Sequence, residues 1–275
     1  MKLTRRETLT LAAAATAAGV AGFPSLASAK DGDVIDQLKL MAPKGIPDKV
    51  EGDAAAKVTF IEYASPTCPH CALFSNTILG PFKDKYVKTG KVKFILRPFA
   101  RNTTDAAIFM LAEAAAKSVQ AQSAPAPTTD ASSSAASSAP ADASSSAPAP
   151  SSSEAASSSA APAPADPANP SGYSAAAVEA YENVIATFFK TQDTWEVSDK
   201  PLDAIKAIAF QLGFNEDSFK QALTDQDFFN KIQTMRDQAL NDFGLEGTPT
   251  FYVNGKQLTG EKTMDQLDAE ITPLL

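Results

Sequence analysis

Two runs of residues decide the fold of this chain: Val58-Thr59-Phe60-Ile61-Glu62-Tyr63 and, after four more residues, Cys68-Pro69-His70-Cys71. The first run is short and rich in β-branched and aromatic residues, which predicts a strand. After the second run, apolar residues recur at every fourth position from Phe74 to Tyr86, which predicts one face of a helix. A pair of cysteines therefore stands between a strand and the start of a helix.

These two cysteines and His70 are the only Cys and His residues among the 275. A closed zinc or iron–sulfur site needs about four such ligands, so a structural metal site within one chain is close to excluded, and no cofactor is expected. Two thiols three residues apart remain, which is the spacing of a redox pair. The motif alone still leaves open a structural disulfide or two thiols without a role.

The N-terminus predicts export. Lys2 and Arg5-Arg6 form a positive region, an Ala-rich apolar stretch follows over residues 9–23, and Ala27-Ser28-Ala29 offers a signal-peptidase site. The adjacent arginines also fit a twin-arginine signal, so both export routes stay open. A membrane anchor is less favoured, because the stretch is shorter than the ~20 residues of a span. We expect residues 1–29 to be removed and the protein to act in the periplasm, where a CxxC pair can be held oxidised.

The remaining patterns alternate between strands and helices. Residues 92–96 predict a second strand, and Asn254-Gly255 between two β-rich runs predicts a hairpin with a type I′ turn over residues 250–258. Gly80-Pro81 should kink the helix after the cysteines, because proline lacks a donor and clashes with the preceding turn. Helical periodicity covers six further stretches: residues 105–118, 175–190, 201–212, 216–223, 226–243 and 263–271.

This order indicates an α/β domain, residues 57–104 and 244–275, with a helical insertion at residues 105–243 and an N-terminal lead-in at residues 30–56. Inside the insertion, from about residue 120 to 171, the composition collapses to Ser, Ala and Pro, with an acidic residue every twelve positions: Asp130, Asp142, Glu154 and Asp166. Such blocks carry no Leu, Ile, Val or aromatic side chain to stack, so a folded solenoid is not expected. We predict that residues 120–172 are disordered.

Helix placement gives the two sulfurs different roles. Cys68 precedes the helix, where unpaired N–H groups and the helix dipole lower the pKa of a thiol, so we expect an accessible and reactive sulfur. Cys71 lies on the same apolar side as Phe74 and should be the buried, resolving partner. Pro69 suits the first helical position. His70 can donate to the Cys68 thiolate or place a charge against it.

Two residues outside the motif are further candidates. Glu62 shares a strand face with Val58 and Phe60, so it is either an exposed strand end or a buried acid with a raised pKa. A buried acid there could relay a proton for Cys71. Thr248-Pro249 precedes a strand, where a trans turn is the more common outcome. A cis bond would leave the backbone before the proline free to pair with an extended peptide.

The segments EYASPTCPHC and GTPTFYVNG, residues 62–71 and 247–255, resemble those of the DsbA-like thiol–disulfide oxidoreductases, which have a thioredoxin fold with a helical insertion. The resemblance covers about residues 50–118 and 173–275. It implies that Cys68 is the nucleophile, that Cys71 resolves and forms the disulfide with it, and that Glu62 is the buried acid. It also implies that Pro249 is a cis-proline, with Thr248 beside it at the substrate. The Ser/Ala/Pro repeat is not part of the family pattern.

The resemblance further implies partners and a direction of catalysis. The expected substrates are reduced, unfolded or partly folded exported proteins, and the expected reoxidation partner resembles the membrane protein DsbB, which passes electrons to quinone. Thr248 also occurs in isomerases, so a reductase or isomerase of the same fold stays open, although residues 30–56 are too short for the isomerases' dimerisation domain. A chaperone-like binding protein with a non-catalytic CxxC is the rival of another class. The net charge of −8 argues against nucleic acid.

Overall fold

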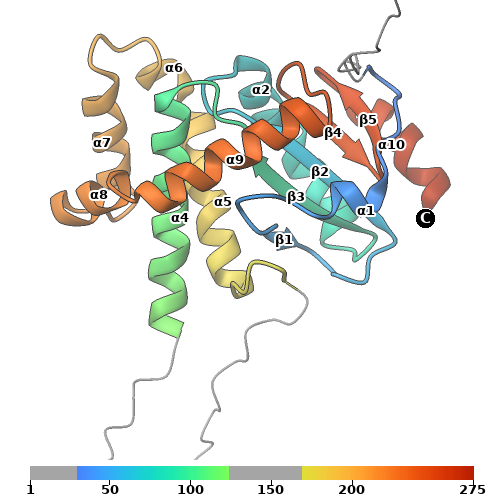
Figure 1. Cartoon of the computed structure of the whole chain (residues 1–275), viewed down its shortest axis with the longest axis horizontal. Helices are drawn as coiled ribbons and strands as arrows, with labels where there is room; N and C mark the ends of the chain where they lie inside the picture. The colour runs from blue at the N-terminus through green and yellow to red at the C-terminus, as the bar shows by residue number, and fades with distance from the viewer. Residues whose placement is uncertain (1–29, 124–168) are drawn as a thin grey trace, which may run out of the picture.

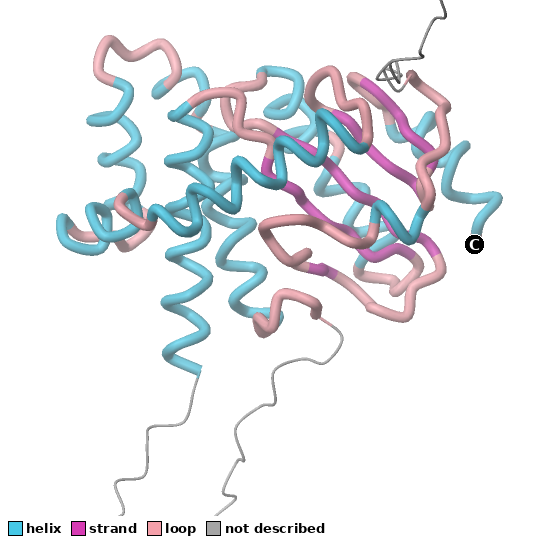
Figure 2. Tube along the Cα trace, viewed as in Figure 1, coloured by secondary structure: helices cyan, strands magenta, loops and turns pink. Residues whose placement is uncertain are grey.

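A computed structural model of the chain describes residues 30–123 and 169–275. The predicted export signal, residues 1–29, and the central part of the predicted disordered repeat, residues 124–168, lie outside the described residues. A sheet and a group of helices stand side by side, as Figures 1 and 2 show. The α/β class expected from the sequence is confirmed.

The sheet has five strands in the order β1-β3-β2-β4-β5, and only β2 and β3 are parallel. The β2–β3 pair needs a crossover connection, which the helix after the cysteines supplies. The strands are β1 (Val50–Glu51), β2 (Val58–Ala64), β3 (Val92–Pro98), β4 (Thr250–Val253) and β5 (Lys256–Thr259).

The helices before the hairpin are α1 (Gln37–Leu40), α2 (Pro69–Thr77), α3 (Leu79–Phe82), a π-helical turn η1 (Lys83–Val87), α4 (Thr103–Ser123), α5 (Ala175–Lys190), α6 (Gln192–Trp195), α7 (Pro201–Gln211), α8 (Glu216–Leu223) and α9 (Gln226–Asp242). After the hairpin come α10 (Met264–Ile271) and a 3₁₀ turn, η2 (Thr272–Leu274). Several begin at side chains that accept a backbone N–H of the first turn, which satisfies an otherwise unpaired donor. These caps include Ser174, Asp225 and Thr263.

One face of the sheet packs against α2, α3 and η1. The Phe60 ring of β2 lies 4.5 Å from the Phe82 ring between centroids, and the Phe251 ring of β4 lies 4.6 Å from that of Phe74. Glu62 pairs in register with Phe251, so its side chain is on this same apolar face. The apolar residues that pack α2 and α3 against the sheet therefore also enclose the Glu62 side chain.

The opposite face packs against α1 and α9, and α9 crosses in front of the sheet in Figure 1. The Tyr63 and Tyr252 rings lie 6.0 Å apart here, and Phe243 at the end of α9 lies 6.4 Å from Tyr252. The sheet is thus covered on both faces, with its parallel pair in the interior. Between the strands of the hairpin, Asn254 and Gly255 both have positive φ, 46° and 91°, as the predicted type I′ turn requires.

The kink predicted at Gly80-Pro81 takes the form of a break in the helix. α2 ends at Thr77, Ile78 caps it, and α3 restarts at Leu79 before the chain opens into the π turn. In an unbroken helix the ring of Pro81 would clash with the carbonyl of Thr77, four residues earlier. The interruption therefore falls one turn ahead of the proline, and the apolar stripe still points at the sheet.

The structure corrects the predicted limits of the disordered repeat and of the lead-in. Residues 120–123 continue α4, which runs longer at both ends than the predicted 105–118. Beyond the repeat, Asn169 is buried, and its side chain donates to the Val50 carbonyl at 3.2 Å. The lead-in supplies β1, which pairs with β3, and the short helix α1. Short elements such as these carry too few residues for a periodicity to show in the sequence.

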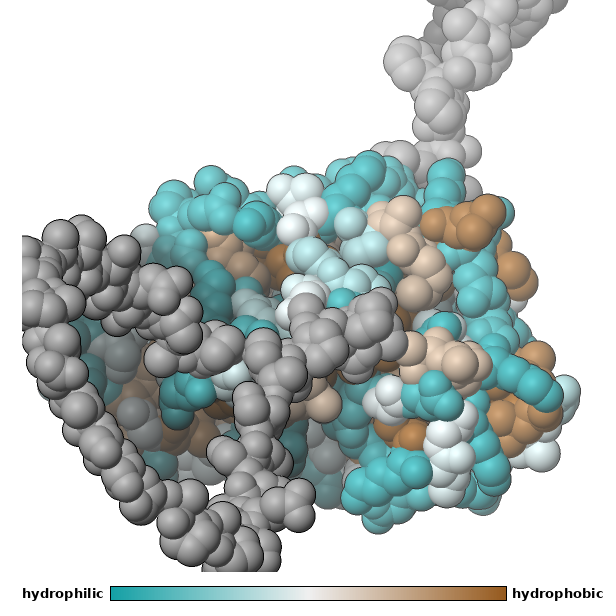
Figure 3. Space-filling view, turned by 90° about the horizontal axis from the view of Figure 1, so that it is seen from below, coloured by the Kyte–Doolittle hydropathy of each residue, from teal (hydrophilic) through white to brown (hydrophobic). Residues whose placement is uncertain are grey.

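The surface seen in Figure 3 is mostly hydrophilic where described residues are visible, with small groups of hydrophobic side chains between the charged ones. Such scattered apolar residues are ordinary for a folded protein. Within residues 30–123 and 169–275, no helix combines the length and the apolar composition that crossing a membrane would require.

A buried ion pair ties the lead-in to the sheet. The Arg97 guanidinium donates to both carboxylate oxygens of Asp48 at 2.7 Å, to the Leu40 carbonyl at 2.7 Å and to the Tyr63 hydroxyl at 2.9 Å. Both charged side chains are almost wholly buried. Burying such a pair costs the desolvation free energy of two charged groups, and the hydrogen bonds of Arg97 to Asp48, Leu40 and Tyr63 offset part of this cost.

We expect the Asp48→Ala variant to lose about 3 kcal/mol of unfolding free energy, because it leaves the Arg97 charge buried without its counter-ion. Urea unfolding followed by circular dichroism measures this loss. The matched control is Asp84→Ala, which removes the exposed i,i+4 pair with Lys88 and should leave the midpoint unchanged. An Asp48→Ala protein as stable as its parent would contradict a structural role for the pair.

Candidate active site

The cysteine motif forms the start of α2. Cys68 is the N-cap residue, in an extended conformation, and Pro69 occupies the first helical position. The Cys68 carbonyl accepts the first intrahelical bond, from the Ala72 N–H at 3.1 Å, while the Cys68 N–H donates to the Ser65 carbonyl at 2.9 Å. Both cysteines are free thiols. The sequence predicts the same positions, with Cys68 ahead of the helix and Cys71 on its inner side.

The two sulfurs are less different in exposure than the sequence predicts. Cys71 is buried as expected, but Cys68 is only 2% exposed, so the expectation of an accessible sulfur is wrong for this form. The reason is a contact from the other end of the chain: the Cys68 thiol donates to the Thr248 carbonyl at 3.1 Å. The turn before β4 therefore covers the sulfur.

The acidities of the two thiols are shifted in opposite directions. A hydrogen bond from Cys71 lowers the pKa of Cys68 to about 5 against the opposing effect of burial, with further help from the Thr248 side chain and the backbone N–H groups of Cys71 and His70. Burial raises the pKa of the Cys71 thiol well above its ordinary value, and its hydrogen bond to Cys68 and the nearby Glu62 charge act in the same direction. At neutral pH Cys68 is a thiolate and Cys71 a thiol.

Glu62 is the buried acid that strand alternation allowed for. Its side chain is 1% exposed, and neither carboxyl oxygen has a hydrogen-bond partner among the described residues. Burial raises the pKa of Glu62 to about 8, with a smaller rise from the Cys68 charge and an opposing effect of Lys83. The Glu62 charge in turn raises the pKa of the Cys71 thiol, and both groups are buried in a low-dielectric interior.

The His70 ring contacts a carboxylate outside the motif. The imidazole Nδ1 contacts the carboxylate of Glu261, in the loop between β5 and α10, and both side chains are largely exposed. Only the backbone N–H of His70 acts on Cys68. The expected donation from the His70 ring to the Cys68 thiolate is therefore wrong for this conformation, because a carboxylate outside the motif holds the ring.

The Thr248-Pro249 peptide bond is cis, as the resemblance implied. The Thr248 carbonyl accepts the protonated Cys68 thiol at 3.1 Å, and it loses this donor when Cys68 ionises or enters the disulfide. The Thr248 hydroxyl is buried, and the Thr248 side chain helps to lower the pKa of Cys68.

The sequence argument missed a carboxylate that fixes the loop in front of Cys68. Asp105, buried in the first turn of α4, accepts the Thr67 N–H at 2.7 Å, the Ser65 hydroxyl at 2.7 Å and the Arg101 N–H at 2.8 Å. The Arg101 side chain returns to the same loop, donating to the Ser65 and Thr67 hydroxyls at 2.9 Å each. No local pattern marks this cluster, although an Asp in a first helical turn is a modest signal of a cap.

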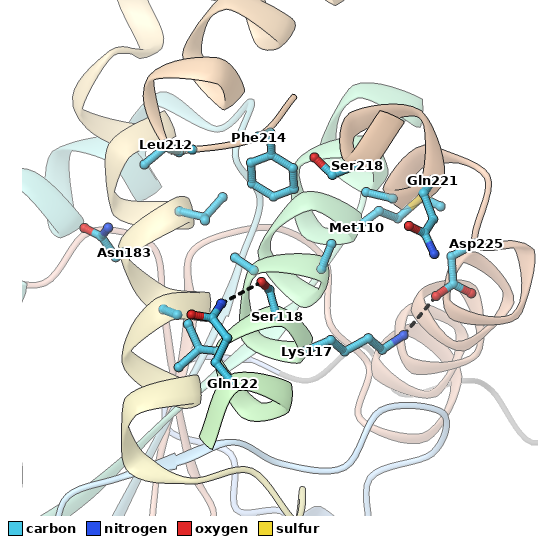
Figure 4. Close-up of a pocket in the computed structure, with 17 residues that line it drawn as sticks. Met110, Lys117, Ser118, Gln122, Asn183, Leu212, Phe214, Ser218, Gln221 and Asp225 are labelled. Carbon is cyan, nitrogen blue, oxygen red and sulfur yellow. Dashed lines mark hydrogen bonds and ion pairs between the residues drawn. The ribbon is translucent and has the colours of Figure 1, made fainter. Parts of the chain in front are cut away.

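Cavities of about 670 Å³ and about 460 Å³ are two of those that lie outside the motif. The larger, about 670 Å³, opens between α4, α5 and α8, with apolar residues such as Met110 and Phe214 inside it and the Lys117–Asp225 ion pair at its rim (Figure 4). It contains no residue of the cysteine motif. The smaller, about 460 Å³, adjoins the motif, because Thr67, directly before Cys68, lines it together with Arg101, Trp195 and Pro201.

Nothing in the described residues 30–123 and 169–275 gathers three His, Cys, Asp or Glu side chains in a way that could hold a metal ion. The groups in and around the motif that can take part in a reaction are the two thiols, the carboxyl group of Glu62 and the backbone at Thr248. Together they can perform thiol–disulfide exchange, which needs an ionised sulfur, a second sulfur within reach and a means of moving one proton.

Sequence comparison points the same way. A family model described as Thioredoxin matches residues 45–161 and 165–272. A relative from Rickettsia felis, described as a candidate protein-disulfide oxidoreductase, is 24% identical over 230 residues, which are 83% of this chain and 60% of the relative. This chain thus spans less than two thirds of that relative's length.

Solved structures share the architecture. The crystal structure of a double variant of alpha-DsbA1 from Wolbachia pipientis matches with a TM-score of 0.60 and 24% identity, covering 87% of this chain and 96% of that one. The crystal structure of DsbA from Chlamydia trachomatis matches with a TM-score of 0.53 and 17% identity, covering 88% of this chain and 96% of that one. The predicted thioredoxin fold with a helical insertion is confirmed by these likenesses.

Proposed function

This chain belongs to the thioredoxin family, and we propose that it is a thiol–disulfide oxidoreductase that works by exchange at Cys68-Pro69-His70-Cys71. The observation that carries the proposal is the inequality of the two thiols. The pKa of Cys68 is lowered to about 5, while that of Cys71 is raised. One sulfur is then ready to leave or attack as a thiolate, and the other resolves.

In the proposed reaction a substrate thiolate attacks the Cys68 sulfur of the Cys68–Cys71 disulfide. A substrate–Cys68 bond forms, the Cys68–Cys71 bond breaks, and Cys71 leaves with the electron pair. A second substrate thiolate then attacks the substrate sulfur of the mixed disulfide and releases Cys68 as a thiolate. The substrate loses two electrons and gains a disulfide, and the protein gains two electrons as a dithiol.

Glu62 has the role of proton donor and acceptor in this scheme. Cys71 leaves as a thiolate inside an apolar interior, where its charge is disfavoured, so it must take up a proton. With a pKa of about 8, Glu62 is protonated in most molecules at neutral pH, and its charge acts on the Cys71 thiol. It can supply that proton and recover it when the dithiol is reoxidised.

The proposed direction is oxidation of substrates. Stabilising the Cys68 thiolate favours the dithiol form, because the disulfide has no charge to stabilise, and this makes the disulfide a stronger oxidant. The substrates we propose are reduced, unfolded or partly folded exported proteins in the periplasm, reached after an N-terminal signal is removed. A membrane partner resembling DsbB and linked to quinone would reoxidise the dithiol.

The surface beside the motif suits unfolded polypeptide. Leu73, in α2, is 48% exposed, and Val197, beside the rim residue Glu196 of the 460 Å³ cavity, is 77% exposed. Leu202 follows the cavity residue Pro201 and is also exposed. Single apolar side chains around an open cavity can take up the apolar side chains that a folded substrate hides but an unfolded one displays. In this proposal the helical insertion borders the 460 Å³ cavity, and this cavity receives the unfolded substrate.

Equilibration with glutathione buffers tests the direction. A reduction potential above about −150 mV is expected for an oxidase, whereas a value near −270 mV would instead assign a reductase of the same fold. The same preparation, oxidised and mixed with a dithiol peptide in single turnover, should form one peptide disulfide per protein molecule. A protein that oxidises no peptide would contradict the exchange reaction and favour a binding protein with a non-catalytic CxxC.

A further inference from the structure

Glu261 is held near the cysteine motif by its own loop. The Gly260 N–H before it donates to the Pro249 carbonyl at 3.0 Å, which ties the loop to the turn that covers Cys68. The Lys262 ammonium after it donates to the Thr259 carbonyl at 2.7 Å and pairs with Asp31 at 3.3 Å. The carboxylate of Glu261 is therefore presented from a segment fixed on both sides, and it contacts the His70 ring.

This contact decides what the His70 ring can do. The Nδ1 nitrogen faces the Glu261 carboxylate and so is not available to donate to a sulfur, and no hydrogen bond from Nε2 to Cys68 is among those of the described residues. What reaches Cys68 from His70 is its backbone N–H. The His70 side chain thus contacts Glu261, which lies 191 positions away in the sequence.

We infer that Glu261 is a positioning residue for the proposed exchange reaction: it holds the His70 ring at the β5–α10 loop, away from the Cys68 sulfur, and so limits how oxidising the Cys68–Cys71 disulfide is. The inference rests on the proposed function, because it concerns the disulfide that takes part in the proposed exchange. The quantity that it concerns, the equilibrium between disulfide and dithiol, can be measured without any substrate.

The reason is that the two redox forms differ in charge. A donor or positive charge beside Cys68 stabilises the thiolate of the dithiol form and has no charge to act on in the disulfide. Releasing the His70 ring toward the sulfur therefore shifts the equilibrium toward the dithiol. Removing the negative charge of Glu261 acts with the same sign, because a like charge disfavours the thiolate, and this contribution does not depend on the His70 ring.

The test is the equilibrium in which the protein disulfide and two glutathione thiols give the protein dithiol and one glutathione disulfide. For the Glu261→Ala variant we expect the constant of this reaction to rise about threefold, which is about 14 mV in reduction potential. In a His70→Ala background the same substitution should change the constant by less than about 1.5-fold, since there is no ring left to release.

Glu216→Ala is the matched control, because Glu216 also forms a partly exposed ion pair, with Lys206 in α7, and should leave the constant unchanged. An unchanged constant in Glu261→Ala overturns the inference. So does an equal change with and without His70, which would assign the effect to charge alone. Peptide oxidation by the parent protein is scored separately, so failure of the proposed function is distinguishable from failure of this inference.

Discussion

Replacing Cys68 with serine is expected to abolish oxidation of a dithiol peptide, with a rate loss of more than about a thousandfold. The hydroxyl of serine cannot form the disulfide, and no other cysteine in the chain could substitute, because Cys71 is the only one left. Replacing Cys71 instead should preserve attack by the Cys68 thiolate but remove the resolving sulfur. That variant is expected to accumulate mixed disulfides with substrate, seen as adducts on non-reducing gels and by mass spectrometry.

Alkylation of the reduced parent protein is the companion measurement. With a pKa of about 5, Cys68 is about 99% thiolate at pH 7, so iodoacetamide should modify it first, while Cys71 stays unmodified. The low exposure of Cys68 slows the reaction in absolute terms but not its preference. Faster labelling of Cys71, or a Cys71→Ser variant that captures no substrate, would contradict the assigned roles.

Replacing Glu62 with glutamine is expected to stabilise the reduced protein increasingly as the pH rises. The pKa of Glu62 is about 8 in the folded protein and near 4.5 in the unfolded chain, so between these values the folded state binds more protons. Parent stability therefore falls as pH increases through this window, whereas glutamine does not titrate. The stability difference between variant and parent should grow by about 4 kcal/mol from pH 4 to pH 8.

Urea unfolding at several pH values under excess reductant measures this difference, and the Cys68 thiol titrates in both proteins, so its contribution largely cancels. Glu246→Gln, at an exposed position just before the Thr248 turn, is the control for removing a surface carboxylate and should leave the stability close to that of the parent. A flat difference for Glu62→Gln would mean that the carboxyl is not a buried acid. The same variant should also slow peptide oxidation if the proton passes through Glu62.

Much of the fold follows from local patterns in the sequence. The apolar stripe from Phe74 to Tyr86 and the β-rich run before Cys68 are set by spacing within a few residues, and the structure contains both. The inward position of Cys71 follows from its place on the stripe. The burial of Glu62 follows from alternation along β2, although the pattern alone left an exposed strand end open.

The parts that could not be predicted are contacts between segments far apart in the sequence. Asp105 reaches Thr67 across 38 positions, and Glu261 reaches His70 across 191. A carboxylate in a helix or loop gives no local sign of the partner that the fold will bring to it. The cover of Thr248 over Cys68, across 180 positions, is of the same kind, and it is why the sulfur is less exposed than its place at a helix start suggests.

The bond from the Thr67 N–H to buried Asp105 has a further consequence, because it joins the segment before Cys68 to the first turn of α4. A backbone amide held in this way exchanges its hydrogen with solvent only when the contact opens. Exchange at this single amide in heavy water therefore reports how often the loop before Cys68 separates from the first turn of α4. Comparing its rate in the disulfide and dithiol forms would tell whether a turnover loosens the protein around the reacting sulfur.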